Sequence, residues 1–138
     1  MILLIRHASA GERSEWEGDD RLRPLDERGR RQAQALVEAL AGYEVERILS
    51  SPYVRCVQTV EPLAAARGLT VAHAPELGED RQDVDAAPLL RSLAGRPVAV
   101  CTHGGVEHAL GLDARYKKGA TLVLREGLEL VRSIPPAY

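Results

Sequence analysis

Short apolar runs without alternation recur along the chain and predict buried strands. The clearest are residues 2–5 and 97–102, where successive apolar side chains leave no polar face. Continuous runs of this kind are typical of strands covered on both faces of a parallel sheet. Residues 47–50 and 70–73 are interpreted as two further short strands of the same sheet.

Between the strands predicted at 2–5 and 47–50, the apolar positions follow the period of a helix. Asp26 can cap this helix, and Gly42 stands just past its end. Its apolar stripe consists of Ala33, Leu36, Val37 and Leu40. Residues 8–23, which precede the helix, are rich in Gly, Ser and charged residues, and they predict a surface loop, where functional groups often lie.

A second helix is predicted directly after the strand at 47–50. Ser51 is predicted as its N-cap and Pro52 as its first residue, because the missing N–H of proline does no harm there. Gly68 closes this helix, and Arg55 falls in its first turn. Two more helices are predicted, one at 83–93 with Asp83 as its cap and a short one at 106–112.

The order of these elements predicts a fold class. Residues 120–124 and 128–133, joined through Glu126 and Gly127, indicate a closing hairpin. Alternation of strands and helices before it favours an α/β fold, a three-layer α/β/α sandwich with a mainly parallel central sheet and a C-terminal antiparallel hairpin. Residues 1–138 are interpreted as a single domain, since a chain of this length can bury one core.

Composition and charge narrow the classes of partner. The chain is 45% hydrophobic and 28% charged, with a formal net charge of −2, so neither nucleic acid nor an anionic membrane surface is expected as a partner. Residues 1–5 are too short for a signal peptide or membrane span, and a cytoplasmic location is expected. Cys56 and Cys101 are interpreted as reduced packing residues, because neither belongs to a closely spaced pair.

Polar clusters follow three of the predicted strands. Ligands of open α/β sheets bind beyond the carboxyl ends of the strands, so these clusters are expected to share one pocket. Two of them also lead into helices, whose free backbone N–H groups favour a bound anion. The clusters are Arg6-His7, Ser50-Ser51-Pro52 with Arg55, and His103-Gly104-Gly105.

Two arginines and two histidines in one pocket point to phosphate as the ligand. Guanidinium groups match phosphate oxygens, and a histidine among arginines should have a lowered proton affinity. His7 is therefore the expected nucleophile. Alone, His7 could be a structural strand-end residue and His103 a turn residue before two glycines. A metal site is not expected, because no third ligand stands at fixed spacing and the arginines oppose a cation.

The same motifs resemble those of the histidine phosphatase superfamily, which has the phosphoglycerate mutase-like fold. The match extends nearly end to end. It rests on Arg6-His7-Ala8, on Ser50-Ser51-Pro52-Tyr53-Val54-Arg55 with Gln58-Thr59, and on Thr102-His103-Gly104-Gly105. Within the superfamily, the chain resembles the short SixA-like phosphohistidine phosphatases in residues 6–10 and in Arg23-Pro24-Leu25 followed by Gly29.

The resemblance implies roles for individual residues. His7 is expected to become transiently phosphorylated, while Arg6, Arg55 and His103 hold the phosphoryl oxygens, and no metal or cofactor is needed. Gly104 and Arg23 are expected to line the substrate site. Family members acting on phosphate esters use a carboxylic acid to protonate the leaving oxygen. Glu79 is the choice for that acid, with Asp80 or neither as the alternatives.

The spacing of the motifs bears on the reaction and its substrate. Fewer than fifty residues separate Arg55 from His103, which leaves no room for the helical lid of mutases and favours hydrolysis. The leading hypothesis is a phosphohydrolase acting on protein phosphohistidine, whose partner is then a phosphohistidine protein. The alternatives are a phosphatase of small phosphorylated metabolites or nucleotides, and a phosphate-binding module without turnover. Nothing in the residues predicts an oligomeric state.

Overall fold

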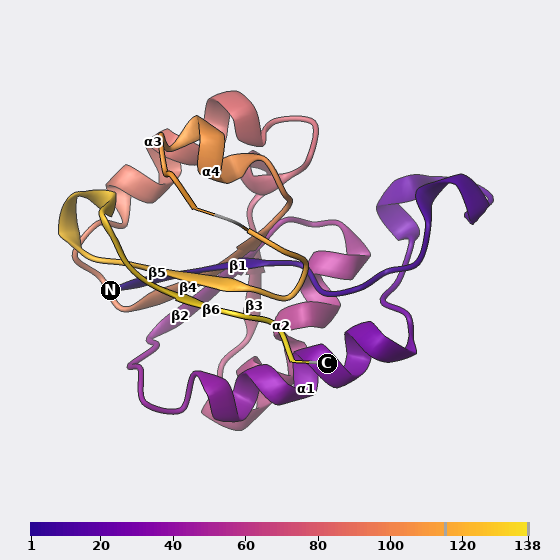
Figure 1. The fold of residues 1–138 in the computed structure, drawn as a ribbon, viewed down its shortest axis with the longest axis horizontal. Coiled ribbons are helices and arrows are strands. Elements are labelled where there is room, and N and C mark those ends of the chain that lie inside the picture. The colour runs from indigo at the N-terminus through magenta and orange to yellow at the C-terminus, as the bar shows by residue number, and fades with distance from the viewer. Residues whose placement is uncertain (115, 138) are drawn as a thin grey trace.

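A six-stranded sheet forms the centre of the molecule in a computed structural model, which describes residues 1–114 and 116–137. The strand order is β3-β2-β4-β1-β5-β6 (Figure 1). The strands are β1 (Ile2–Arg6), β2 (Arg47–Ser50), β3 (Val71–His73), β4 (Val98–Thr102), β5 (Thr121–Leu124) and β6 (Leu130–Ile134). Strands β1 to β4 pair in parallel, whereas β5 and β6 are antiparallel. The predicted fold class is confirmed.

Helices cover both faces of this sheet. In Figure 1, α1 and α2 lie below the sheet, and α3 and α4 lie above it. Their bounds are α1 (Glu27–Ala39), α2 (Val54–Arg67), α3 (Gln82–Ser92) and α4 (Val106–Ala109). Four short 3-10 helices lie in the described loops: η1 (Arg13–Glu15), η2 (Asp20–Leu22), η3 (Pro75–Leu77) and η4 (Glu126–Leu128). Among the described residues, no helix is both long and apolar enough to span a membrane.

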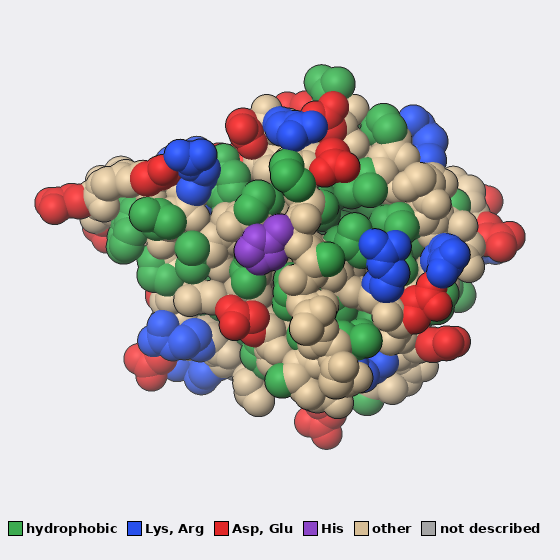
Figure 2. All heavy atoms as spheres, turned by 180° about the vertical axis from the view of Figure 1, so that it is seen from behind, with side chains coloured by type: hydrophobic (Ala, Val, Ile, Leu, Met, Phe, Trp, Pro, Cys, Tyr) green, Lys and Arg blue, Asp and Glu red, His purple; other side chains and the backbone are tan. Residues whose placement is uncertain are grey.

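The apolar run of β1 divides its side chains between two cores. Leu3 and Ile5 pack with residues of α1 and α2, whereas Ile2 and Leu4 pack with residues of α3. Because successive side chains of a strand point to opposite faces, a sheet covered on both sides requires an unbroken apolar run. On the face shown in Figure 2, acidic and basic side chains are interspersed rather than gathered into a field of one sign.

The helix starts agree with the sequence in part. Asp26 caps α1 as predicted, its side chain accepting a hydrogen bond from Gly29 N at 2.7 Å, and Gly68 ends α2 in the left-handed region. The prediction of Ser51 as the N-cap of α2 is wrong, because Tyr53 occupies that position in extended conformation. Ser51 still accepts from Tyr53 N, but its hydroxyl lies against His103.

The helices on the other face also differ from their predicted limits. The N-cap of α3 is Arg81 rather than Asp83, which lies inside the first turn. The helix predicted at 106–112 is α-helical only over Val106–Ala109, and Gly111 has a φ of +69°. A left-handed residue ends a helix, and glycine adopts it without strain.

The close approach of α1 to the loop after β1 gives a stability prediction. A Cβ at Gly29 would overlap the Ser9 carbonyl oxygen, which also accepts from Asp26 N. We expect Gly29→Ala to lower the free energy of unfolding by roughly 1–3 kcal/mol in urea denaturation, as overpacking does. Gly42→Ala is the matched control, since a Cβ there meets open space, and it should change stability by less than about 0.5 kcal/mol. Equal stability of the two variants would contradict this packing.

Candidate active site

His7 stands just beyond β1, where its backbone N–H donates to Thr102 O on β4 at 3.0 Å. The imidazole is only 4% exposed, and its Nδ1 lies 2.8 Å from Ala8 O. A carbonyl oxygen can only accept, so Nδ1 carries the proton and Nε2 keeps a free electron pair. This tautomer is the one that an attacking histidine Nε2 requires.

The environment of His7 keeps the ring uncharged. Burial lowers the pKa of His7 to about 3, partly opposed by the hydrogen bond to Ala8 O. The positive charges of Arg55, Arg6 and Lys118 lower this pKa further. Both effects disfavour the imidazolium form, as expected for a histidine buried among cations.

His103 faces His7 from the end of β4. The two ring centroids are 5.5 Å apart in an edge-to-face arrangement, and His103 is 1% exposed. Its Nε2 lies 2.9 Å from Ser51 Oγ, and its Nδ1 lies 3.6 Å from a Glu79 oxygen. A Ser51 hydroxyl that donates to Nε2 leaves the ring proton on Nδ1, toward Glu79. Burial lowers the pKa of His103 to about 2, with further lowering by His7, Arg55 and Arg13 and an opposing contribution from Asp20.

Arg55 extends from the first turn of α2 into the same region, as predicted. Its side chain is fully buried, and Nη1 donates to Asp20 O at 2.8 Å. Nη2 lies 3.1 Å from an Asp20 carboxylate oxygen and 3.4 Å from Glu79 Oε2. Its Nε has no hydrogen-bond partner among the described residues. The Asp20 and Glu79 carboxylates therefore compensate the charge of this buried guanidinium.

Arg6 packs against the glycine turn that follows β4. Its Nη1 donates to Tyr116 O at 2.6 Å, whereas its buried Nε has no partner within the described part of the chain. A Cβ at Gly104 would come within 2.6 Å of Arg6 Cζ. Gly104 is therefore required for the guanidinium to lie flat against the backbone at this point.

Glu79 contacts two arginines, Arg13 and Arg55. Arg13 Nη2 donates to both carboxylate oxygens, at 2.6 and 2.8 Å. The carboxylate also approaches Arg55 and His103, whereas Asp80 is exposed and makes neither contact. Of the two acidic residues considered from the sequence, the structure brings Glu79 to His103.

Loop 8–25 supplies a carboxylate that the sequence analysis missed. Asp20 bridges Arg55 and Arg23, with its Oδ1 accepting from Arg23 Nε at 2.9 Å. Arg23 is buried and also donates to Ala10 O at 2.6 Å, whereas Arg21 is exposed and pairs with Asp19. No periodicity marks Asp20 or Arg13 in the sequence, and only the folded loop brings them to the site.

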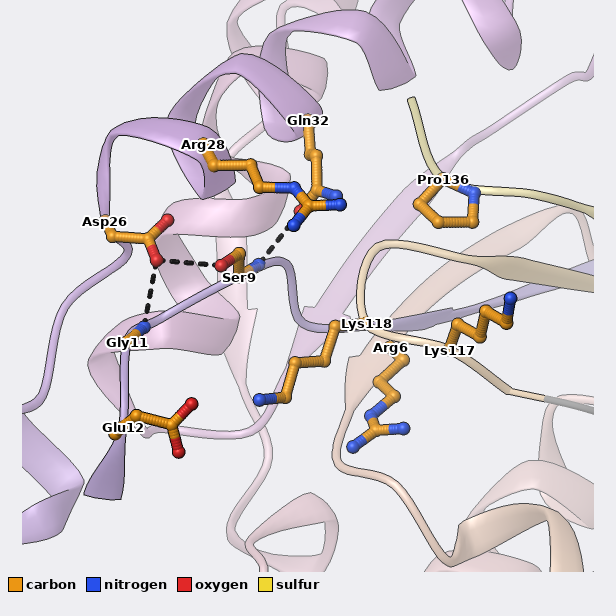
Figure 3. Close-up of a pocket in the computed structure, with 10 residues that line it drawn as sticks. All are labelled: Arg6, Ser9, Gly11, Glu12, Asp26, Arg28, Gln32, Lys117, Lys118 and Pro136. Carbon is orange, nitrogen blue, oxygen red and sulfur yellow. Dashed lines mark hydrogen bonds between the residues drawn. The ribbon is translucent and has the colours of Figure 1, made fainter. Parts of the chain in front are cut away.

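Arg6, His7 and Glu79 line a hollow of about 370 Å³, whereas the buried side chains of Arg55 and His103 are not part of its lining. It lies at the carboxyl ends of β1 and β4, where open α/β sheets bind ligands. Its lining residues are Arg6, His7, Gly11, Glu12, Arg13, Arg23, Glu79, Gly104, Gly105 and Lys118. A second hollow of about 460 Å³ adjoins it and is drawn in Figure 3. In residues 1–114 and 116–137, no three His, Cys, Asp or Glu side chains are grouped to hold a metal ion.

Comparison with known proteins identifies the class. A family model described as histidine phosphatase superfamily (branch 1) matches residues 2–86. The chain therefore belongs to the histidine phosphatase superfamily, and the resemblance of its motifs is confirmed.

Similarity in sequence extends to a curated protein of known activity. An 8-oxo-(d)GTP phosphatase from Mycolicibacterium smegmatis is 43% identical over 110 residues, which cover 76% of this chain and 34% of that protein. The chain thus spans about a third of the length of this relative.

Solved structures share the fold at lower identity. The protein histidine phosphatase SixA in complex with tungstate superposes with a TM-score of 0.80 at 22% identity, covering 96% of this chain and 95% of that chain. A mycobacterial glucosyl-3-phosphoglycerate phosphatase superposes with a TM-score of 0.62 at 23% identity, covering 80% and 76%. Such likenesses describe the fold alone.

The buried histidines predict how stability depends on pH. The ordinary pKa of histidine is 6.5, and that of His103 in the folded protein is about 2. Between roughly pH 3 and 6 the unfolded chain binds one more proton at this residue, so the protein loses stability as pH falls. We expect His103→Gln to reduce the slope of unfolding free energy against pH by about 1 kcal/mol per pH unit in this range. An unchanged slope in denaturant titrations at several pH values would contradict the burial of a neutral ring.

Proposed function

We propose that the chain is a phosphohydrolase that transfers a phosphoryl group to His7 and then to water. One observation carries this proposal: a buried, uncharged His7 fixed through Nδ1 by Ala8 O, with Nε2 free beside Arg6 and Arg55. A nucleophile of this kind needs a free electron pair and cations around the group it attacks.

The first step forms a bond from His7 Nε2 to phosphorus and breaks the bond from phosphorus to the leaving oxygen. Arg6, which lines the hollow, binds the phosphoryl oxygens, and the positive charges of Arg6 and Arg55 beside His7 offset theirs during transfer. His103 donates from Nδ1 to the same group. Water then attacks phosphorus, the N–P bond breaks, and inorganic phosphate leaves with His7 neutral again.

Glu79 is proposed as the acid that protonates the leaving oxygen. Its carboxylate lies 2.6 Å from Arg13 Nη2 and 3.4 Å from Arg55 Nη2. The acid is needed for alcohol leaving groups and much less for phosphohistidine or an acyl phosphate.

A phosphorylated small molecule is proposed as the substrate. The two adjoining hollows, of about 370 and 460 Å³, have the dimensions of small-molecule sites, and the 43% identical relative is an 8-oxo-(d)GTP phosphatase. Protein phosphohistidine is the second candidate, supported by the SixA-like motifs and by the fold shared with SixA. Relative kcat/KM for a phosphohistidine peptide and for nucleotides distinguishes the two.

Trapping the phosphoenzyme tests the reaction. Brief mixing with a labelled phosphodonor, followed by an alkaline denaturing quench that preserves phosphohistidine, should label the wild-type protein. His7→Ala should abolish the label and reduce kcat on the order of 10³-fold or more. His108→Ala is the matched control, because His108 is exposed and outside the pocket, and it should label normally. An unlabelled wild-type protein would favour the phosphate-binding module, and a labelled His7→Ala would assign another nucleophile.

Substitution of Glu79 tests its role as the acid. Glu79→Gln should lower kcat by about 10²–10⁴-fold for an alkyl phosphate, and by far less for phosphohistidine or acetyl phosphate. The exposed neighbour gives the control Asp80→Asn, for which we expect activity close to wild type on every substrate. An equal loss for good and poor leaving groups would show that Glu79 acts only by holding Arg13 and Arg55.

A further inference from the structure

The hollow drawn in Figure 3 opens beside the hollow that contains His7. The two share four lining residues, Arg6, Gly11, Glu12 and Lys118. A group that leaves the first hollow over this shared rim enters the second directly. The second hollow is therefore placed to receive a group attached to the transferred phosphoryl group.

The second hollow is positively charged although the whole chain is not. Four cationic side chains and two carboxylates line it, whereas the formal net charge of the chain is −2. One of the carboxylates, Asp26, already accepts from Gly29 N, Ser9 Oγ and Gly11 N. The four cationic side chains still exceed the two carboxylates, and a cationic cleft of this kind concentrates anions locally.

Lys118 is held at the shared rim by the backbone. The N–H of Gly119 lies 3.1 Å from Arg6 O and 3.0 Å from His7 O, which ties the turn to the end of β1. In Figure 3 the Lys118 side chain extends between Glu12 and Arg6. Its charge contributes to the lowered pKa of His7, so the ammonium lies within electrostatic reach of the nucleophile.

The side chain of Lys117 points in a different direction from that of Lys118. In Figure 3 its side chain points away from Lys118 and Arg6. It also lines a separate, mostly apolar hollow with Asp113, Ala114 and Leu130. The chain has no other lysine, so these two adjacent residues carry the same charge in two different surroundings.

We propose that Lys118 and Arg6 bind a second phosphate group, and that the substrate is a phosphoanhydride such as a nucleoside diphosphate or triphosphate. This inference rests on the proposed function and specifies its substrate class. A phosphate monoester of an uncharged alcohol places no anion in the second hollow and gains nothing from its charge. A lysine ammonium is a compact point charge suited to a phosphate oxygen.

Cleavage of a phosphoanhydride needs less help from a general acid than cleavage of an alkyl phosphate. His7 Nε2 bonds to the terminal phosphorus, the bridging P–O bond breaks, and the bridging oxygen keeps the electron pair as part of the leaving phosphate. That leaving group is already stable as an anion, and Lys118 offsets its charge. Water then releases inorganic phosphate from His7, and the product is the nucleotide shortened by one phosphate.

Steady-state kinetics with a nucleoside diphosphate and the matching monophosphate test this inference. Wild-type protein should show at least a tenfold higher kcat/KM for the diphosphate, since one ionic contact worth about 1.4 kcal/mol gives a factor of ten. Lys118→Ala should lower kcat/KM for the diphosphate more than for the monophosphate, and so remove most of that preference. Lys117→Ala, with the same loss of charge, should keep the preference.

A binding measurement provides a readout apart from turnover. Calorimetry on His7→Ala should show inorganic pyrophosphate binding roughly tenfold more tightly than inorganic phosphate, and adding Lys118→Ala should remove the difference. The inference is overturned if wild-type protein prefers the monophosphate or a phosphohistidine peptide, or if the Lys117 and Lys118 variants behave alike. Absence of a phosphoenzyme at His7 would instead reject the proposed function itself.

Discussion

Two imidazole rings, those of His7 and His103, lie 5.5 Å apart at the carboxyl edge of the sheet and are almost inaccessible to solvent. Their burial among arginines disfavours the protonated form of either ring, and this constraint governs the chemistry of the pocket. A protonated His7 would have no electron pair to attack phosphorus. The same pocket concentrates positive charge, which an anionic substrate balances on binding.

Contacts from several parts of the chain hold the two buried histidines and the buried arginine Arg55 in place. Hydrogen bonding of His7 N to Thr102 O joins the ends of β1 and β4, and Gly119 N joins a later turn to the same point. Asp20 compensates Arg55 from the loop after β1. Removal of one partner of such a buried charge is costly, so this loop is part of the site's architecture as well as its entrance.

Much of this arrangement could be predicted from the sequence, for a physical reason. Buried parallel strands can be recognised in a sequence as apolar runs. Their carboxyl ends meet at one edge of the sheet, which brings Arg6, His7 and His103 together. Asp20 and Lys118 could not be predicted, because they lie in segments without periodicity and reach the pocket only through tertiary contacts. The prediction of Ser51 as a helix cap is wrong for a simple reason. A serine just before a helix can cap that helix or bind another side chain, and in the folded protein its hydroxyl lies against His103.

The central claim is that His7 is neutral, with its proton on Nδ1 and its Nε2 free. Nitrogen-15 NMR of the histidine side chains measures both properties directly in the unliganded protein. The account predicts a neutral Nδ1–H tautomer for His7 that does not titrate between pH 8 and 5, because burial lowers its pKa to about 3. A titration midpoint near the ordinary value of 6.5, or a proton found on Nε2, would contradict it.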